Sequence, residues 1–151
     1  MILAILDVNA LASGFAGLRQ SASTPGEIVR RWQRDEFELA LPAHIIDSLR
    51  RTLSKPYFVA HLTPEETLRA LTELQQRARI VSVAARVSGV APDDEDDQVL
   101  AAAVSAGARF LVTGDRAFLR VGAYHGVELL SPRAFLDLLI ADLDETLLND
   151  G

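Results

Sequence analysis

Cysteine is absent from the 151-residue sequence, and histidine and aromatic residues are scarce. Without cysteine the chain has no disulfide framework, thiolate nucleophile, zinc–thiolate site or iron–sulfur cluster, which favours a reducing compartment. The three histidines, His44, His61 and His125, have no mutual spacing typical of a metal-ligand set. No apolar run approaches the ~18 residues that a membrane span needs, and no basic leader precedes the apolar start. We therefore expect a cytoplasmic protein with no membrane partner.

The charge of the chain is unevenly distributed. The net charge of −6 opposes binding to a polyanion, because nucleic-acid binders neutralise phosphates with lysine and arginine. Five acids lie together at 93–97, however, and the rest of the chain carries 16 acids against 15 bases (21 minus 5 acids). Several of the bases gather in the first third of the chain, where they indicate either solvated helix faces or phosphate contacts.

Short apolar runs alternate with helical patterns along the whole chain. The expected strands cover 2–6, 37–41, 79–83, 110–113 and 127–130, and the expected helices begin near Ala10 and cover 27–35, 42–53, 63–78, 93–106 and 131–140. Such alternation predicts one α/β domain with a central parallel sheet of about five strands and right-handed crossovers. We expect this domain to span 1–140, followed by a frayed acidic tail over 141–151.

Aspartates follow two of the predicted strands at their carboxyl ends. Asp7 leaves the first strand and Asp115 leaves the fourth, so a parallel sheet brings both to one edge. The acid block lies in the first turn of the helix that leads to the fourth strand. If this helix begins near Asp93, then Asp93, Asp96 and Asp97 share one face. Carboxylates that converge in this way repel one another unless a cation or a shared proton relieves the repulsion.

A hard divalent cation fits this predicted set of oxygen ligands. Mg²⁺ or Mn²⁺ prefers carboxylates, and the lack of cysteine argues against zinc. A natural reaction for such a site is phosphodiester hydrolysis, in which the ion activates a water molecule and stabilises the leaving oxygen. Asn9, two residues after Asp7, and Thr113 at the end of the fourth strand can orient a carboxylate or a metal-bound water.

Each of these residues also has a purely structural interpretation. Asp7 and Asp93 are good helix N-caps, Asp94 and Glu95 suit a helix dipole, and Asp115 suits a turn. Capping and the dipole account for two or three of the five clustered acids but not for all five. Nucleophilic catalysis has little support, because Ser48 and Ser105 lack a neighbouring histidine–aspartate pattern.

Four segments of the sequence together resemble the PIN-domain ribonucleases, and more narrowly the VapC-like toxins of toxin–antitoxin pairs. They are residues 5–9, 41–58, 93–103 and 110–115, and the resemblance covers nearly the whole chain. It implies a three-layer α/β/α fold, a Mg²⁺ or Mn²⁺ site of three or four acids, cleavage of RNA, a homodimer or higher homo-oligomer, and a cognate antitoxin. By motif position it implies a metal-site role for Asp7, Asp96 and Asp115, a supporting role for Asn9, and assistance from Asp93 or Asp97.

The sequence departs from the family pattern in the helix after the second strand. The family usually has a glutamate there, and its place falls on Ser48. Asp47 lies one residue earlier, about 100° around the helix, and its side chain is one methylene shorter. Asp47 can replace the glutamate only through a rotated helix or a bridging water, and Ser48 can instead hold a metal-bound water.

Two other classes of function compete with an active nuclease. One is a catalytically weakened PIN domain that acts as an RNA-binding or antitoxin-binding module, which the missing glutamate favours. The other is an acidic phosphoryl-transfer fold. A response-regulator receiver fits poorly because it needs adjacent acids after its first strand and a late lysine, whereas the only lysine is Lys55. A haloacid-dehalogenase-like phosphatase fits equally poorly, because Asn9 stands where it needs a second aspartate.

Overall fold

The computed structural model describes residues 1–150, with side chains described through Asn149. Six strands form one sheet in the order β3-β2-β1-β4-β6-β5. The strands are β1 (Leu3–Leu6), β2 (Glu38–Pro42), β3 (Arg79–Val81), β4 (Phe110–Val112), β5 (Ala123–Tyr124) and β6 (Val127–Leu130). All neighbours pair in parallel except β5, which pairs antiparallel with β6. The prediction of a mainly parallel α/β sheet is confirmed.

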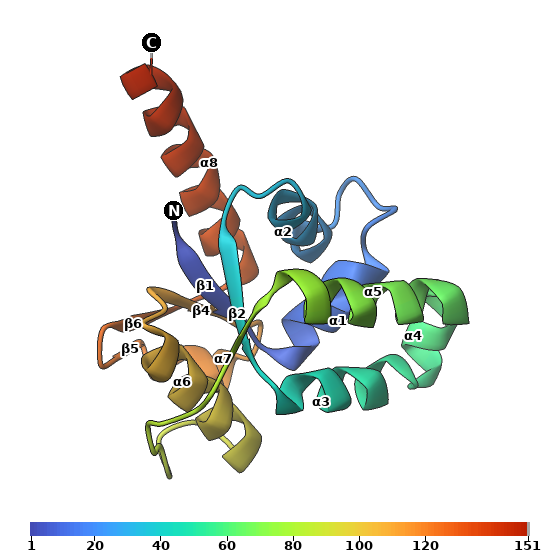
Figure 1. The fold of residues 1–151 in the computed structure, drawn as a ribbon, viewed down its shortest axis with the longest axis horizontal. Coiled ribbons are helices and arrows are strands. Elements are labelled where there is room, and N and C mark those ends of the chain that lie inside the picture. The colour runs from blue at the N-terminus through green and yellow to red at the C-terminus, as the bar shows by residue number, and fades with distance from the viewer. Residues whose placement is uncertain (151) are drawn as a thin grey trace.

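Within residues 1–150, eight helices connect and cover the strands. They are α1 (Val8–Ala16), α2 (Thr24–Gln33), α3 (His44–Leu53), α4 (Pro56–His61), α5 (Pro64–Arg77), α6 (Asp94–Ala106), α7 (Arg116–Leu119) and α8 (Pro132–Asp150). Figure 1 shows α6 on one side of the strands and α1, α3, α4 and α5 on the other. The sheet is thus the middle layer of three, as expected. No helix within residues 1–150 combines the length and the apolar character needed to cross a membrane.

The strand order reverses direction between β1 and β4. The chain adds β2 and β3 on one side of β1, then returns through α6 to place β4 on the other side. In open parallel sheets the crevice beyond the strand ends at such a reversal is the usual ligand site. Leu6 pairs with Val112 across these two strands, so the residues that follow them lie side by side. The topology therefore brings Asp7 next to Thr113.

The structure differs from the sequence-based expectation at several element boundaries. The helix expected to begin near Ala10 begins at Val8 and continues through Gly14 to Ala16. A Cβ atom at Gly14 would lie 2.4 Å from Cγ2 of Val29, so glycine here lets α1 approach α2 closely. The short helices α4 and α7 and the two-residue strand β5 were not predicted. The last helix does not end near Ile140 but continues to Asp150, so the expected frayed tail is helical as far as the structure describes it.

Candidate metal centre at the carboxyl ends of β1 and β4

Asp7 is buried at the carboxyl end of β1 and caps the N-terminus of α1. Its Oδ1 accepts a hydrogen bond from the backbone N–H of Ala10 at 2.8 Å, and its Oδ2 accepts one from the hydroxyl of Thr113. Burial raises the pKa of Asp7 above its ordinary value, while the two hydrogen bonds act in the opposite direction. The capping interpretation is therefore correct for Asp7, and the cap also fixes the orientation of the carboxylate.

Thr113 links Asp7 to Asp115. The Thr113 side chain is fully buried, and besides donating to Asp7 its Oγ1 accepts the backbone N–H of Asp115 at 3.1 Å. Asp115 in turn caps α7, because its Oδ1 accepts the N–H of Ala117 at 2.9 Å. Its other oxygen, Oδ2, has no hydrogen bond to the described part of the chain. One carboxylate oxygen of Asp115 thus remains available for a ligand.

Asp96 projects from the first turn of α6 and is half-buried. Desolvation by burial raises the pKa of Asp96 to about 7, and the charges of Asp93, Asp7, Asp115 and Glu95 add to the effect in that order. These charges act on Asp96 because the carboxylates lie within electrostatic reach of one another. The structure therefore brings Asp7, Asp96 and Asp115 to one place, although they come from three separate segments of the sequence.

Glu95 is a member of this group that sequence reasoning assigned only to the helix dipole. Its charge contributes to the raised pKa values of both Asp7 and Asp96. Its Oε1 is buried and has no hydrogen-bond partner in the described structure. A buried carboxylate oxygen without a partner is costly, and a bound cation is one way to remove that cost. The size of the acid block was the available signal, but the sequence did not reveal which of its members point inward.

The chemistry of these donors fits a hard divalent cation. They are carboxylates that repel one another, and they lie at a sheet edge with one orphaned oxygen among them. Within the described residues no three histidine or acidic side chains already stand close enough to share one ion. Asp7 and Asp115 are each held in place by a helix-capping hydrogen bond. The carboxylates therefore lie near one another but do not form a complete coordination sphere.

Asp97 serves a different purpose from the one expected. It is buried, and its two oxygens accept three backbone N–H groups, from Gly89 at 2.9 Å, Val90 at 3.2 Å and Ala91 at 2.7 Å. The prediction that Asp97 shares the ligand face is wrong, because its carboxylate anchors the loop before α6. Asp93 is the N-cap of α6 and accepts the N–H of Asp96 at 2.8 Å, and its charge also acts on Asp96.

The other expected site residues form no hydrogen bond with these carboxylates within the described part of the chain. Asp47 is exposed and forms an ion pair with Arg50 at 3.0 Å, and its charge is absent from those that shift Asp7 and Asp96. Ser48 is buried, and its hydroxyl accepts a hydrogen bond from Arg51 at 3.2 Å. Asn9 is exposed in the first turn of α1. In this structure Asp47 thus faces solvent and is paired with Arg50.

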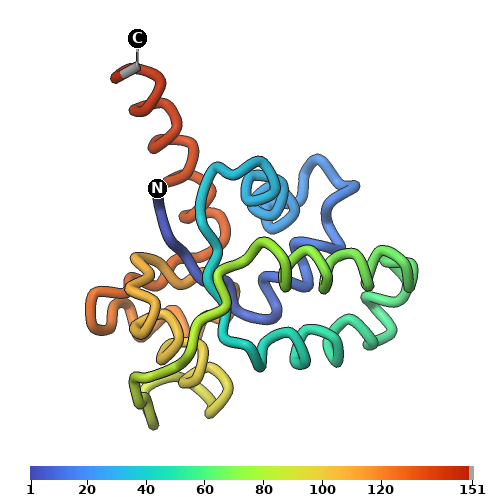
Figure 2. The backbone as a smooth tube through the Cα atoms, in the orientation of Figure 1, coloured from blue at the N-terminus to red at the C-terminus, as the bar shows by residue number. Residues whose placement is uncertain are grey.

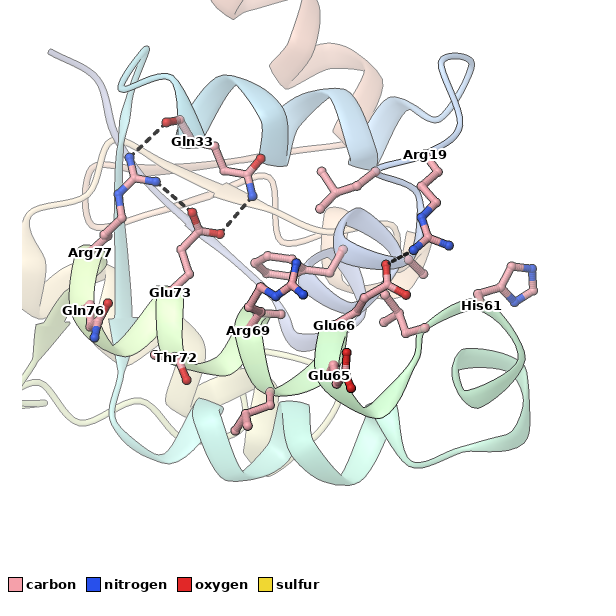
Figure 3. A pocket seen from close by; sticks show the side chains of 16 residues that line it. Arg19, Gln33, His61, Glu65, Glu66, Arg69, Thr72, Glu73, Gln76 and Arg77 are labelled. Carbon is pink, nitrogen blue, oxygen red and sulfur yellow. Dashed lines mark hydrogen bonds and ion pairs between the residues drawn. The ribbon is translucent and has the colours of Figure 1, made fainter.

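A separate cavity of about 850 Å³ lies between the end of α1, α2 and α5 (Figure 3). Several of the charged side chains that line this cavity form ion pairs or hydrogen bonds with one another. Arg77 contacts Glu73 at 2.8 Å, Gln33 donates to Glu73 at 2.9 Å, and Arg19 pairs with Glu66 (Figure 3). None of Asp7, Asp96, Asp115 or Glu95 lines it. The cavity lacks the clustered, unsatisfied carboxylates that metal chemistry needs, because Glu66 and Glu73 are already paired with arginines.

Comparison with known proteins agrees with this geometry. The profile of the PIN domain family matches residues 4–117, a segment that contains Asp7, the acid block and Asp115. A chain in the crystal structure of VapBC2 from Rickettsia felis bound to a promoter DNA fragment has a similar fold. The TM-score is 0.56 and the identity 13%, over 86% of this chain and 98% of that one. No curated protein matches the sequence. Because the family profile covers well over half of the chain, the protein belongs to the PIN domain family.

Proposed function

We propose that this PIN domain is a Mg²⁺- or Mn²⁺-dependent endoribonuclease and the toxin component of a toxin–antitoxin pair. PIN domains are generally nucleases. The observation that carries the proposal is the meeting of Asp7, Asp96 and Asp115 at the strand-order reversal, where each carboxylate is within reach of the others' charge. A set of carboxylates that repel one another is built at a cost in stability, and binding a cation is the function that explains this cost.

Asp7, Asp96 and Asp115 would hold the ion, with Glu95, whose buried Oε1 has no hydrogen-bond partner in the described structure, as a further carboxylate. When bound, a divalent ion activates a water molecule for in-line attack on a phosphodiester and stabilises the leaving oxygen. Thr113 positions two of the ligands at once, because its hydroxyl donates to Asp7 and accepts from the backbone of Asp115. It fixes the spacing between β1 and β4 at the site.

Arginines next to the site can hold the RNA backbone. Arg116 and Arg120 lie in and just after α7, whose N-cap is Asp115, and both are exposed. Neither forms an ion pair with another described residue, whereas Arg30 and Arg31 in α2 are occupied by Glu27. Free guanidinium groups beside the carboxylates offset the repulsion that an acidic site exerts on phosphates.

The toxin assignment and the partners rest on the fold and the sequence motifs. The R. felis structure is of VapBC2 bound to a fragment of promoter DNA. By analogy we propose a cognate antitoxin protein as a partner of this chain and a homodimer or higher homo-oligomer as its assembled state. The boundary between a nuclease domain over 1–140 and a separate C-terminal segment remains a prediction.

A weakened PIN domain that binds RNA or antitoxin without cleavage is the second candidate. The position of Asp47 favours it, because this carboxylate is exposed and paired with Arg50 instead of facing the other acids. With Ser48 in the glutamate's place, the site has one fewer acid from α3 than the family pattern. Glu95 restores the count of four carboxylates, which is why we rank the active enzyme first.

The decisive experiment is a cleavage assay on labelled single-stranded and structured RNA with Mg²⁺ or Mn²⁺. We expect cleavage by the wild-type protein, and loss of cleavage in EDTA and in the Asp7→Asn and Asp96→Asn variants. Asp94→Asn is the matched control, because Asp94 lies in the same turn of α6 but is exposed. Cleavage that persists in EDTA would refute the metal mechanism, and RNA binding without cleavage would select the second candidate.

A further inference from the structure

The C-terminal half of α8 extends beyond the body of the protein. Figures 1 and 2 show the helix leaving the sheet and projecting away from the other elements. Its first turns pack into the core, where Phe135, Leu136 and Leu139 are buried. From Ile140 onward the helix has fewer neighbours, yet large apolar side chains continue. The projecting part thus carries residues of the kind that a helix normally buries.

These residues form a single stripe that begins in the core. Leu136, Ile140, Leu143 and Leu147 are spaced by four, three and four residues, which places them on one face of the helix. The exposed fraction rises along the stripe from 5% at Leu136 to 37%, 38% and 63% at the next three positions. The spacing is the one by which two helices pack against each other in a coiled coil. One face of α8 therefore has the apolar spacing that packing against another helix requires.

The remaining faces of the projecting segment are acidic. Asp142, Asp144 and Glu145 are exposed or half-buried, and none forms an ion pair within residues 1–149. No lysine or arginine follows Arg133 in the sequence. Asp142 and Glu145 are three residues apart on the helix, so their like charges repel each other. Asp144 lies beside the uncovered apolar stripe, a position that is explained if a positive charge of a partner lies against it.

Charge selects among the possible occupants of this surface. A second α8 would bring apolar residues of the right spacing but also a second set of acids, with no base to meet them. Nucleic acid and anionic membranes are repelled by the same acids. A polypeptide helix with an apolar stripe flanked by lysine or arginine satisfies both features at once. Asp144, which flanks the stripe and has no ion pair within residues 1–149, would then face a base, whereas Asp137 is already paired with Arg133 at 2.8 Å.

We infer that the stripe Leu136–Ile140–Leu143–Leu147 on α8 is a docking surface for a basic amphipathic helix of a partner protein. The inference rests on burial, spacing and charge in α8 alone, and does not depend on nuclease activity. It assigns a binding role to a segment that the sequence indicated only as an acidic tail.

A designed peptide pair tests this inference on the full chain. Both peptides place leucines at the same coiled-coil spacing, one with lysines beside the leucines and the other with glutamates. Fluorescence anisotropy should show that the wild-type protein binds the lysine peptide and not the glutamate peptide. Leu143→Gln/Leu147→Gln should weaken binding by about tenfold or more, because two apolar contacts are lost. Asp137→Lys/Asp144→Lys should reverse the preference towards the glutamate peptide.

Leu148→Gln is the matched control. Leu148 is 79% exposed, more than any residue of the stripe, but it points away from it. Its substitution should leave the affinity unchanged, while circular dichroism confirms that each variant is folded. Three results would overturn the inference. The first two are that the lysine peptide does not bind, or that the two peptides bind equally well. The third is that the wild-type protein sediments as a dimer that Leu143→Gln/Leu147→Gln dissociates, which would make a second copy of the chain the occupant.

Discussion

Replacing Asp96 by asparagine should stabilise the metal-free protein at alkaline pH. The folded-state pKa of Asp96 is about 7, against an ordinary value of 3.8. A carboxyl whose pKa is raised by folding does not oppose folding below pH 3.8, where it is protonated in both states. It opposes folding increasingly as the pH rises towards 7, and fully above that pH, because the folded protein must then carry the buried charge.

The magnitude follows from this difference. The folded-state pKa of Asp96 exceeds its ordinary value by about three, which corresponds to roughly 4 kcal/mol of unfolding free energy for a fully desolvated charge. Because Asp96 is only half-buried, solvent screening reduces the effect to about 1–2 kcal/mol. Asparagine keeps the shape and removes the charge, so Asp96→Asn should gain about this much at pH 8 and almost nothing at pH 4.

Urea unfolding in EDTA at pH 4 and pH 8 measures this gain. We expect the free energy of unfolding of Asp96→Asn to exceed that of the wild type at pH 8. Asp94→Asn removes an exposed carboxylate from the same turn and should show no such gain, because its charge favours the N-terminus of the helix. An Asp96→Asn variant that is no more stable than the wild type at pH 8 would show that the carboxylates do not repel one another as the structure indicates.

Two further substitutions separate the ligands from their neighbours. Asp97→Asn should destabilise the fold by about 1–3 kcal/mol, because an amide cannot accept all three N–H groups of residues 89–91. Thermal unfolding measures this loss, and a large drop in Mn²⁺ affinity of the folded variant would instead return Asp97 to the ligand set. Asp47→Ala should leave the Mn²⁺ affinity within about twofold of the wild type, since Asp47 forms only an exposed ion pair. A clear loss in calorimetry would mean that Asp47 moves in to replace the family glutamate.

Local signals in the sequence were sufficient for most of the fold. The apolar run before Asp7 predicted a buried strand, and the Thr63–Glu66 capping box predicted the start of α5. The short helices α4 and α7 were not predicted, because the residues at their starts also occur at helix ends and in turns. Proline can end one helix or begin the next, and Pro56, which follows the predicted helix over 42–53, occupies the first turn of α4. Asp115 was a turn candidate and is also the N-cap of α7.

The site was predictable by position but not in its details. Asp7 and Asp115 follow strands that the parallel sheet must bring together, so their meeting follows from topology. The acids of α6 could not be sorted from sequence, because the rotation of that helix depends on its packing against the sheet. In the structure Glu95 and Asp96 lie within reach of Asp7, while Asp97 turns towards the loop at 89–91.

Titration of Mn²⁺ into the metal-free protein by isothermal calorimetry tests the central claim most directly. The wild-type protein should bind the ion, and Asp7→Asn and Asp96→Asn should each weaken binding by about tenfold or more, while Asp94→Asn has no effect. Absence of binding by the wild type, or equal binding by the Asp7 and Asp96 variants, would contradict a metal centre at the carboxyl ends of β1 and β4.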